Sequence, residues 1–288
     1  GDVYEQGSGR ADNILLNGSD TAITIAAPLS DGASLYINKE SLSGATSKAV
    51  ATKAEDGAQK YFHTDEPLSN YAFTWNGEDN TVVLSAAKHD AHPLCDKANC
   101  TDPAHQGEHP SVEFTIPLGG VYNGDPLTTG SYFLTDDLIL SKTLTISGDV
   151  KLCLNGHSIV ANFNDYAITV DLNATLSLAD CSEDQTGTVT HGVKDDNTKY
   201  TSGGVHVNAP KGSSEKATTT FNLYGGSISG NTSSSWQGTG VYVNGQSGST
   251  TTFNMYGGAV SGNTLGGSSA SFGGGVFVWY YAAFNMYG

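Results

Sequence analysis

Residues 219–232 read TTFNLYGGSISGNT, residues 251–264 read TTFNMYGGAVSGNT, and residues 282–288, AAFNMYG, begin the same phrase again. A second motif runs in phase with the first, as GVHV at 204–207, GVYV at 240–243 and GVFV at 275–278. A repeat of about 30 residues predicts a solenoid or an array of stacked units. Apolar and polar residues alternate within each phrase and Gly-Gly pairs interrupt it, which indicates short strands joined by corners rather than helices.

Each unit therefore has room for three short strands, which is one coil of an all-β solenoid, the right-handed parallel β-helix. Equivalent residues of stacked strands lie about 4.8 Å apart. We therefore predict a single column of Phe221, Phe253 and Phe284, and an asparagine ladder of Asn231 and Asn263. The same order continues upstream in degraded form, with strands expected at 132–140, 144–146, 150–154, 158–160, 167–170, 174–178 and 188–190.

The distribution of charge agrees with stacking. The 288 residues include 13 basic and 29 acidic side chains, for a formal net charge of -16, and all of them precede Ala217. A charge repeated from coil to coil would face copies of itself, which is unfavourable. The acidic balance disfavours nucleic acid and anionic lipid as partners, and no stretch is apolar enough for membrane insertion. Because the chain starts with Gly1 rather than Met, we expect a monomeric fragment of a larger protein.

Three regions are predicted: residues 1–88, 89–112 and 113–288, the last being the β-helix, truncated at its C-terminus. The first region lacks the repeat. Turn signals separate short strands there, which predicts a small β-sandwich of immunoglobulin-like type. An irregular cap of the β-helix is the competing interpretation. The strands expected in this region are 22–26, 34–38, 71–75 and 81–85.

Residues 89–109, HDAHPLCDKANCTDPAHQGEH, contain the densest chemistry of the chain. Cys95, Cys100, His105 and His109 have the spacing C-x4-C-x4-H-x3-H, and four such ligands can close tetrahedrally around zinc. A structural zinc ion would order a segment that has few hydrophobic residues. The alternative is a Cys95–Cys100 disulfide with solvated histidines, as an oxidising exterior allows. A catalytic metal is the third and weakest alternative.

The other two cysteines, Cys153 and Cys181, fall in strands of adjacent coils. Aligning Leu152 and Leu154 with Leu176 and Leu178 places Cys181 over His157 rather than over Cys153. We therefore predict two free thiols.

The phrases GSYFLTDDLILSKTLTISGDVKLCLNGHSIV (130–160), LSLADCS (176–182) and GTVTHG (187–192) resemble those of large repetitive surface proteins of Gram-positive gut bacteria. Together with the Cys/His-rich stretch, the resemblance covers roughly residues 89–288. It implies β-helical, adhesin-like regions of a secreted protein attached to the bacterial cell wall, and hence an extracellular location on the cell surface.

Outward-facing aromatic side chains suggest a binding function. If Val241 and Val243 point inward, the residue between them points outward together with its equivalents in other coils. A neutral surface with stacked rings suits a host glycan or glycoprotein, immunoglobulin included. The alternative is that the rings pack only on each other or under loops. The candidate ligand-binding residues are Tyr242, Phe277, His206, Tyr224, Tyr256, Trp236 and Trp279.

Two other functions compete with this one. The solenoid could serve as a stalk that spaces a distal module from the wall. Parallel β-helices also include polysaccharide lyases and glycoside hydrolases, which need placed carboxylates and bases. The helix region has no arginine, and its acids fall mostly in turn-like sequences, where Asp satisfies backbone donors, so we expect no enzyme. Those acids are Asp136, Asp137, Asp180, Glu183, Asp184, Asp195 and Asp196.

Overall fold

The computed structural model describes residues 13–14, 16, 22–28, 35–37, 47–64, 71–95, 100, 102–105, 108–122, 124–194, 196–209, 216–233, 238–266 and 273–287. Two candidate residues from the sequence, Trp236 and Asp195, lie outside these residues. The chain forms two compact units, Gly1–Lys88 and His89–Gly288.

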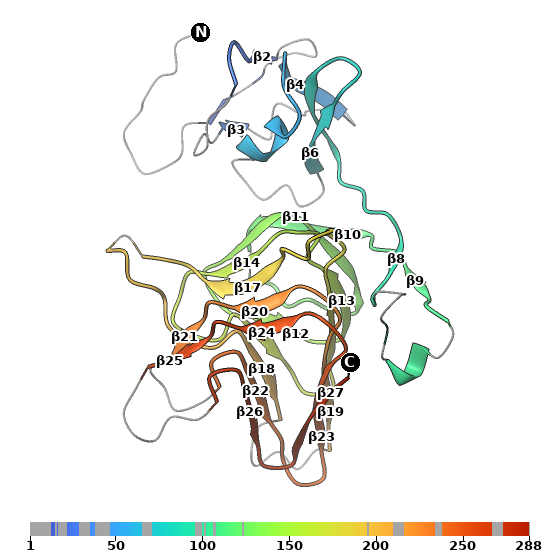
Figure 1. The fold of residues 1–288 in the computed structure, drawn as a ribbon, viewed down its shortest axis with the longest axis vertical. Coiled ribbons are helices and arrows are strands. Elements are labelled where there is room, and N and C mark those ends of the chain that lie inside the picture. Colours follow the sequence, from blue (N-terminus) through green and yellow to red (C-terminus); the bar gives the residue numbers. More distant parts are fainter. Residues whose placement is uncertain are drawn as a thin grey trace. The chain divides into compact units, whose positions relative to one another are not determined.

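The second unit is a parallel β-solenoid, in which each strand pairs with its equivalent in the next coil (Figure 1). One wall is the sheet β12-β15-β18-β22-β26, and the series β13-β16-β19-β23-β27 and β14-β17-β20-β24 form the other two. The long strand β11 joins these two series, because its first residues pair with β13 and its last with β14. The strands of the solenoid are β10 (Ile116–Val121), β11 (Gly130–Leu140), β12 (Leu144–Ile146), β13 (Asp149–Cys153), β14 (Ile159–Ala161), β15 (Ile168–Val170), β16 (Thr175–Ala179), β17 (Thr188–His191), β18 (Val205–Asn208), β19 (Thr218–Leu223), β20 (Ser227–Ser229), β21 (Thr232–Ser233), β22 (Val241–Asn244), β23 (Thr250–Met255), β24 (Ala259–Ser261), β25 (Thr264–Leu265), β26 (Val276–Trp279) and β27 (Ala282–Met286).

Identical side chains form columns through the interior. The rings of Phe221 and Phe253 lie 4.9 Å apart, and those of Phe253 and Phe284 lie 4.8 Å apart, both nearly parallel. The predicted phenylalanine column is therefore confirmed. The asparagine ladder is confirmed as well, since Asn231 Nδ2 donates to Asn263 Oδ1 at 2.9 Å.

A buried histidine extends this ladder by one coil. His191 Nδ1 lies 2.7 Å from Asn231 Oδ1, and both side chains are buried. A second asparagine ladder lies on the outer side of the Phe strands, where Asn254 Nδ2 donates to Asn222 and Asn285 Nδ2 donates to Asn254, each at 2.9 Å. Such ladders satisfy the side-chain amides within the stack and fix the register of the coils.

The expected solenoid strands agree with the observed ones to within two residues at each end, but the expected register at the cysteines is wrong. Leu152 pairs with Leu178, not with Leu176, and Cys153 pairs with Ala179. Cys181 consequently lies beside Asn155, whose Oδ1 is 3.4 Å from its sulfur, and not over His157. This two-residue difference in alignment matters because it brings Cys181 closer to Cys153.

The first unit contains two small sheets around a shared core. One sheet has the order β1-β3-β5 with parallel pairing, and the other has the mixed order β2-β4-β7-β6. The parallel sheet differs from the antiparallel sheets of an immunoglobulin-like sandwich. The core includes Ile37, Val50, Phe62, Val82 and Leu84. The elements are β1 (Asn13–Ile14), β2 (Ile23–Thr24), β3 (Leu35–Ile37), β4 (Ser47–Thr52), η2 (Ala58–Tyr61), β5 (Phe62–Thr64), β6 (Tyr71–Asn76) and β7 (Thr81–Ala86).

Candidate metal centres

The Cys/His-rich segment belongs to the second unit and runs alongside the solenoid (Figure 1). It contains the short antiparallel pair β8 (His92–Pro93) and β9 (Ser111–Val112), with the 3-10 turn η3 (Pro103–His105) between them. A small apolar cluster that includes Cys95, Ala179 and Tyr224 packs the segment against the coils. Two groups of Cys and His side chains form along it, and each could hold a metal such as zinc.

The first group, here called the loop cluster, consists of the predicted ligands Cys95, Cys100, His105 and His109, whose ligand atoms all lie within 4.8 Å of one another. Cys95 Sγ lies 3.2 Å from Nδ1 of both His105 and His109, and Cys100 Sγ lies 3.7 Å from Nδ1 of His105. Tetrahedral zinc with Zn–S of about 2.3 Å and Zn–N of about 2.0–2.1 Å places S and N ligand atoms about 3.5 Å apart. The loop cluster thus has the size of a zinc site.

A buried carboxylate connects the loop cluster to the solenoid. Asp102 Oδ2 accepts a hydrogen bond from the Tyr224 hydroxyl at 2.7 Å, and its Oδ1 accepts one from the Ala104 amide at 2.8 Å. The same Oδ2 lies 3.7 Å from His105 Nδ1, and the His105 ring stacks on Tyr224 at 6.0 Å. The Tyr224 hydroxyl and the Ala104 amide thus hold the Asp102 carboxylate beside the ligand nitrogen of His105.

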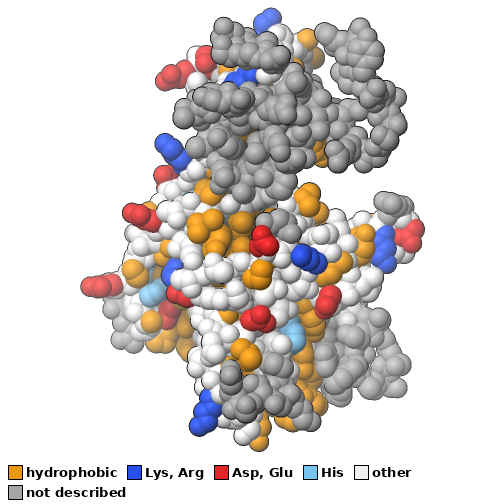
Figure 2. Space-filling model, turned by 180° about the vertical axis from the view of Figure 1, so that it is seen from behind, with side chains coloured by type: hydrophobic (Ala, Val, Ile, Leu, Met, Phe, Trp, Pro, Cys, Tyr) orange, Lys and Arg blue, Asp and Glu red, His pale blue; other side chains and the backbone are white. Residues whose placement is uncertain are grey.

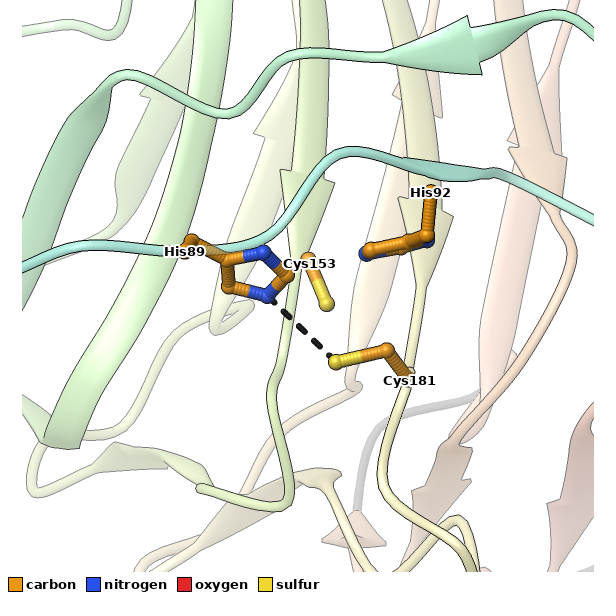
Figure 3. Close-up of side chains that lie close together, drawn as sticks. All are labelled: His89, His92, Cys153 and Cys181. Carbon is orange, nitrogen blue, oxygen red and sulfur yellow. Dashed lines mark hydrogen bonds between the residues drawn. The ribbon is translucent and has the colours of Figure 1, made fainter.

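The second group, here called the flank cluster, was not predicted from the sequence. It joins His89 and His92 of the segment to Cys153, the last residue of β13, and Cys181, two residues after β16. Their four ligand atoms also lie within 4.8 Å of one another. Figure 3 shows the segment crossing the strands, with the four side chains turned toward a common point. His89 Nε2 lies 3.3 Å from Cys181 Sγ.

Each histidine of the flank cluster is held by its other ring nitrogen. His89 Nδ1 lies 2.8 Å from the Asp90 carbonyl oxygen, and His92 Nδ1 lies 2.6 Å from that of Pro93. A carbonyl oxygen can only accept, so both Nδ1 atoms carry a proton, and in the neutral imidazole each Nε2 atom presents a lone pair to the centre of the cluster. The Nε2 atom of His92 is buried and has no hydrogen-bond partner among the described residues.

Aromatic side chains fix the two imidazole rings. His92 stacks on Phe114 at 4.7 Å, and His89 packs against Phe114 at 5.2 Å and Phe133 at 5.0 Å. Both phenylalanines are buried. A rigid, largely apolar surround of this kind holds ligands in place and limits water access to the site.

The pKa values of the two flank-cluster thiols are shifted in opposite directions. Hydrogen bonding to the Cys153 thiol, followed by that to His89, lowers the pKa of Cys181 well below its usual range. The same hydrogen bond, together with burial, raises the pKa of Cys153. Burial raises the pKa of Cys95. All four cysteines are free thiols in this structure, so the sulfurs are available as ligands, and Cys181 is the one most readily ionised.

The flank cluster escaped sequence reasoning because its residues lie far apart in the chain. His89 and Cys181 are 92 residues apart. Two features of the sequence could have indicated this cluster. One is the pair His89-x-x-His92, next to four other predicted ligands, and the other is the presence of two cysteines in adjacent coils. Shifting the coil alignment by two residues, as the Leu152–Leu178 pair requires, would have revealed it.

The predicted aromatic stripe is largely covered. Tyr242 stacks between His206 at 4.8 Å and Phe277 at 5.4 Å, and its side chain is only 4% exposed. Burial lowers the pKa of His206 to about 4. Tyr224 is buried beneath the Cys/His-rich segment, with Tyr256 stacked on it at 4.9 Å. The rings form columns as expected, but the rings of each column pack on one another, and Tyr224 lies under the Cys/His-rich segment.

Exposed aromatic side chains occur instead at the turn after β26. Tyr280 and Tyr281 are 56% and 63% exposed, and the partly buried Trp279 precedes them. Trp279 and Tyr280 pack edge to face at 5.0 Å. Among the predicted binding residues that the structure describes, Trp279 adjoins this exposed aromatic surface.

Three of the candidate acids of the enzyme hypothesis, Asp137, Asp180 and Asp196, accept hydrogen bonds from backbone amides. Asp180 is buried and accepts hydrogen bonds from the amides of Gly156, Ser182 and Gly187 at 2.9, 3.0 and 2.7 Å. Asp137 accepts one from Ser158 and Asp196 one from Thr198. These contacts are those of turn-stabilising side chains.

Comparison of the chain with family models, curated proteins and solved structures finds no match. In the part of the chain that the structure describes, no helix has the length and apolar character needed to cross a membrane.

Proposed function

We propose that this chain is part of a non-catalytic, adhesin-like protein of the bacterial cell surface, in which a β-solenoid presents a neutral aromatic surface to a host glycan or glycoprotein. The solenoid is taken to be right-handed, as crossover connections between parallel strands almost always are. The observation that carries the proposal is the exposed turn Trp279–Tyr281, which lies in the uncharged region after Lys216.

The geometry of this turn supports a binding role. Tyr280 has a left-handed backbone, with φ of 52°, a conformation that is unusual for a bulky residue and is held only where its surroundings require it. The Ala282 amide donates to the Tyr280 carbonyl at 2.9 Å and closes the turn. A backbone fixed in this way loses little conformational freedom on binding. The faces of the aromatic rings suit the CH groups of sugars, and the phenol hydroxyls can bond sugar hydroxyls.

The surface charge fits an uncharged ligand. Figure 2 shows one face of the molecule, on which acidic and basic side chains are scattered among neutral ones. The coils from Ala217 onward contribute no Asp, Glu, Lys or Arg. Recognition there would rest on stacking and neutral hydrogen bonds, so binding should depend little on salt.

The test is binding of the whole chain to an array of glycans, mucins and host glycoproteins, immunoglobulin among them. Replacing both tyrosines of the turn (Tyr280→Ser, Tyr281→Ser) should reduce binding at least tenfold. The matched control is Met286→Ser, which alters a 71% exposed apolar side chain of the same coil and should leave binding unchanged. Equal binding by the tyrosine variant and the unaltered chain would refute the turn as the site.

A stalk is the second candidate, and the burial of Tyr242 favours it. A column of rings that packs on itself strengthens the solenoid without presenting a ligand surface. The array distinguishes the two functions, because a pure spacer binds none of the probes while remaining folded. An enzyme of the β-helix type is the third alternative. Cleavage of any member of a polysaccharide panel, lost on replacing Asp195 and Asp196 with Asn, would establish it in place of the binding protein.

We also propose that the loop cluster holds a structural zinc ion. The support is the agreement of its S–N distances, 3.2 to 3.7 Å, with those of tetrahedral zinc. Metal analysis of protein prepared without added zinc should find zinc, and Cys100→Ser should contain one zinc ion fewer per chain than the unaltered protein. A metal-free protein with a mapped Cys95–Cys100 disulfide would overturn this assignment.

A further inference from the structure

The flank cluster combines residues that have no other evident reason to meet. Two cysteines from successive coils and two histidines from a separate segment converge on one point (Figure 3). Cys153 is fully buried at the end of β13, so its sulfur has a fixed position in the stack. The distance of His89 and His92 from this sulfur therefore depends on where the Cys/His-rich segment packs against the solenoid.

Hydrogen bonds alone leave this cluster incomplete. Both Nδ1 protons are already donated to the carbonyls of Asp90 and Pro93, so in the neutral imidazoles both Nε2 atoms need a donor or a cation. His89 Nε2 has the Cys181 sulfur at 3.3 Å, but His92 Nε2 is buried without a partner among the described residues. A buried nitrogen lone pair without a partner costs free energy.

A disulfide between Cys153 and Cys181 would not remedy this. Oxidation would remove both thiol protons and leave the lone pairs of His89 and His92 facing a neutral sulfur pair. A single cation at the centre satisfies two sulfurs and two nitrogens at once. Tetrahedral S2N2 coordination is typical of zinc, and four protein ligands close the shell, as in a structural rather than a catalytic site.

We propose that His89, His92, Cys153 and Cys181 form a second zinc site, which fastens the Cys/His-rich segment to the solenoid. Both cysteines coordinate the ion as thiolates, any thiol proton still bound is released to solvent, and the two neutral imidazoles complete the shell. The carbonyls of Asp90 and Pro93 hold the imidazoles in the required tautomer, and Phe114 and Phe133 hold their rings. This site is independent of any ligand bound at the Trp279–Tyr281 turn.

The two zinc sites would attach the Cys/His-rich segment to the solenoid at two points. The flank cluster attaches the start of the segment to the coils of β13 and β16, whereas the loop cluster lies against Tyr224, which follows β19. Each zinc ion closes a loop in the chain, and the flank site joins residues 92 positions apart. Such a long closure constrains the unfolded chain more than a short one does.

The test is metal stoichiometry of the whole chain, purified with reductant and measured by elemental analysis together with a thiol count. Both clusters should fill, giving two zinc ions per chain. Cys181→Ser, at an exposed position, should bind one, and Cys100→Ser should also bind one. The double variant should bind none. His157→Gln, which alters a solenoid histidine outside both clusters, is the matched control and should bind two.

A second variant and a second measurement distinguish loss of the site from misfolding of the protein. His92→Gln changes only the segment and should also lower the count to one. Hydrogen exchange of residues 89–94 should accelerate at least tenfold in Cys181→Ser while exchange in β19 and β23 stays slow. Undiminished zinc in both Cys181→Ser and His92→Gln would overturn the proposal, as would a mapped Cys153–Cys181 disulfide in protein with one zinc or none.

Discussion

Removing one ring from the phenylalanine column measures how much stability the stacking of coils provides. Phe253 is fully buried, and its ring lies between those of Phe221 at 4.9 Å and Phe284 at 4.8 Å. Truncating a buried Phe to Ala typically costs about 3–5 kcal/mol. Each stacked pair adds about 0.5–1.5 kcal/mol beyond area burial. The measured range already includes such stacking, and because Phe253 has two stacked neighbours we expect Phe253→Ala to lower the free energy of unfolding by about 4–5 kcal/mol, the upper part of that range.

Urea denaturation followed by tyrosine and tryptophan fluorescence is the assay, with the loss read from the shift of the midpoint at unchanged slope. Phe253→Leu keeps most of the apolar volume and should lose less, roughly 1–2 kcal/mol. Met286→Ala, at a side chain 71% exposed, should change stability by no more than about 0.5 kcal/mol. A loss below about 1 kcal/mol in Phe253→Ala would refute the column as a source of stability.

Three further predictions concern buried polar groups. Asn231→Ala removes the partner of the buried His191 and should cost about 1–3 kcal/mol in urea; an unchanged midpoint would mean that the ladder contributes nothing. Tyr224→Phe leaves Asp102 without its hydroxyl donor and should cost about 1.5–3 kcal/mol, with a much smaller loss if Asp102 is already Asn. His206 should make the solenoid less stable as the pH falls below about 6.5. Its folded-state pKa is about 4, so the unfolded chain binds the proton first; the loss should approach about 3 kcal/mol near pH 4. His206→Phe should flatten that part of the pH profile, and an equally steep profile in the variant would assign the dependence to other groups.

The repeat was sufficient to predict most of the solenoid, because each coil has the same strands and corners as its neighbour. Alternating residues around Phe221 and Phe253 identify strands, the Gly-Gly pairs identify corners, and the period identifies stacking, all from local sequence. The N-terminal unit has no repeat, and its parallel sheet β1-β3-β5 could not be read from spacing, since short strands and turns are compatible with several pairings.

Side-chain direction could be predicted from the sequence, but exposure could not. Alternation correctly placed Val241 and Val243 inside and Tyr242 on the outer side of its strand. Whether an outer side chain contacts solvent depends on which other segments cross it. Tyr224 lies beneath a segment that contains Asp102, more than a hundred positions away in the chain. Tyr280 and Tyr281, in the last coil of this chain, are exposed instead.

The sequence by itself determined that the chain stacks in coils, which columns its Phe and Asn residues form, and that Cys95, Cys100, His105 and His109 belong together. These features are local or periodic, so spacing alone encodes them. Only the tertiary structure brought His89 and His92 to Cys153 and Cys181. That meeting depends on a register difference of two residues and on the path of a non-repeating segment across the coils, and both are set by packing between parts of the chain that share no pattern.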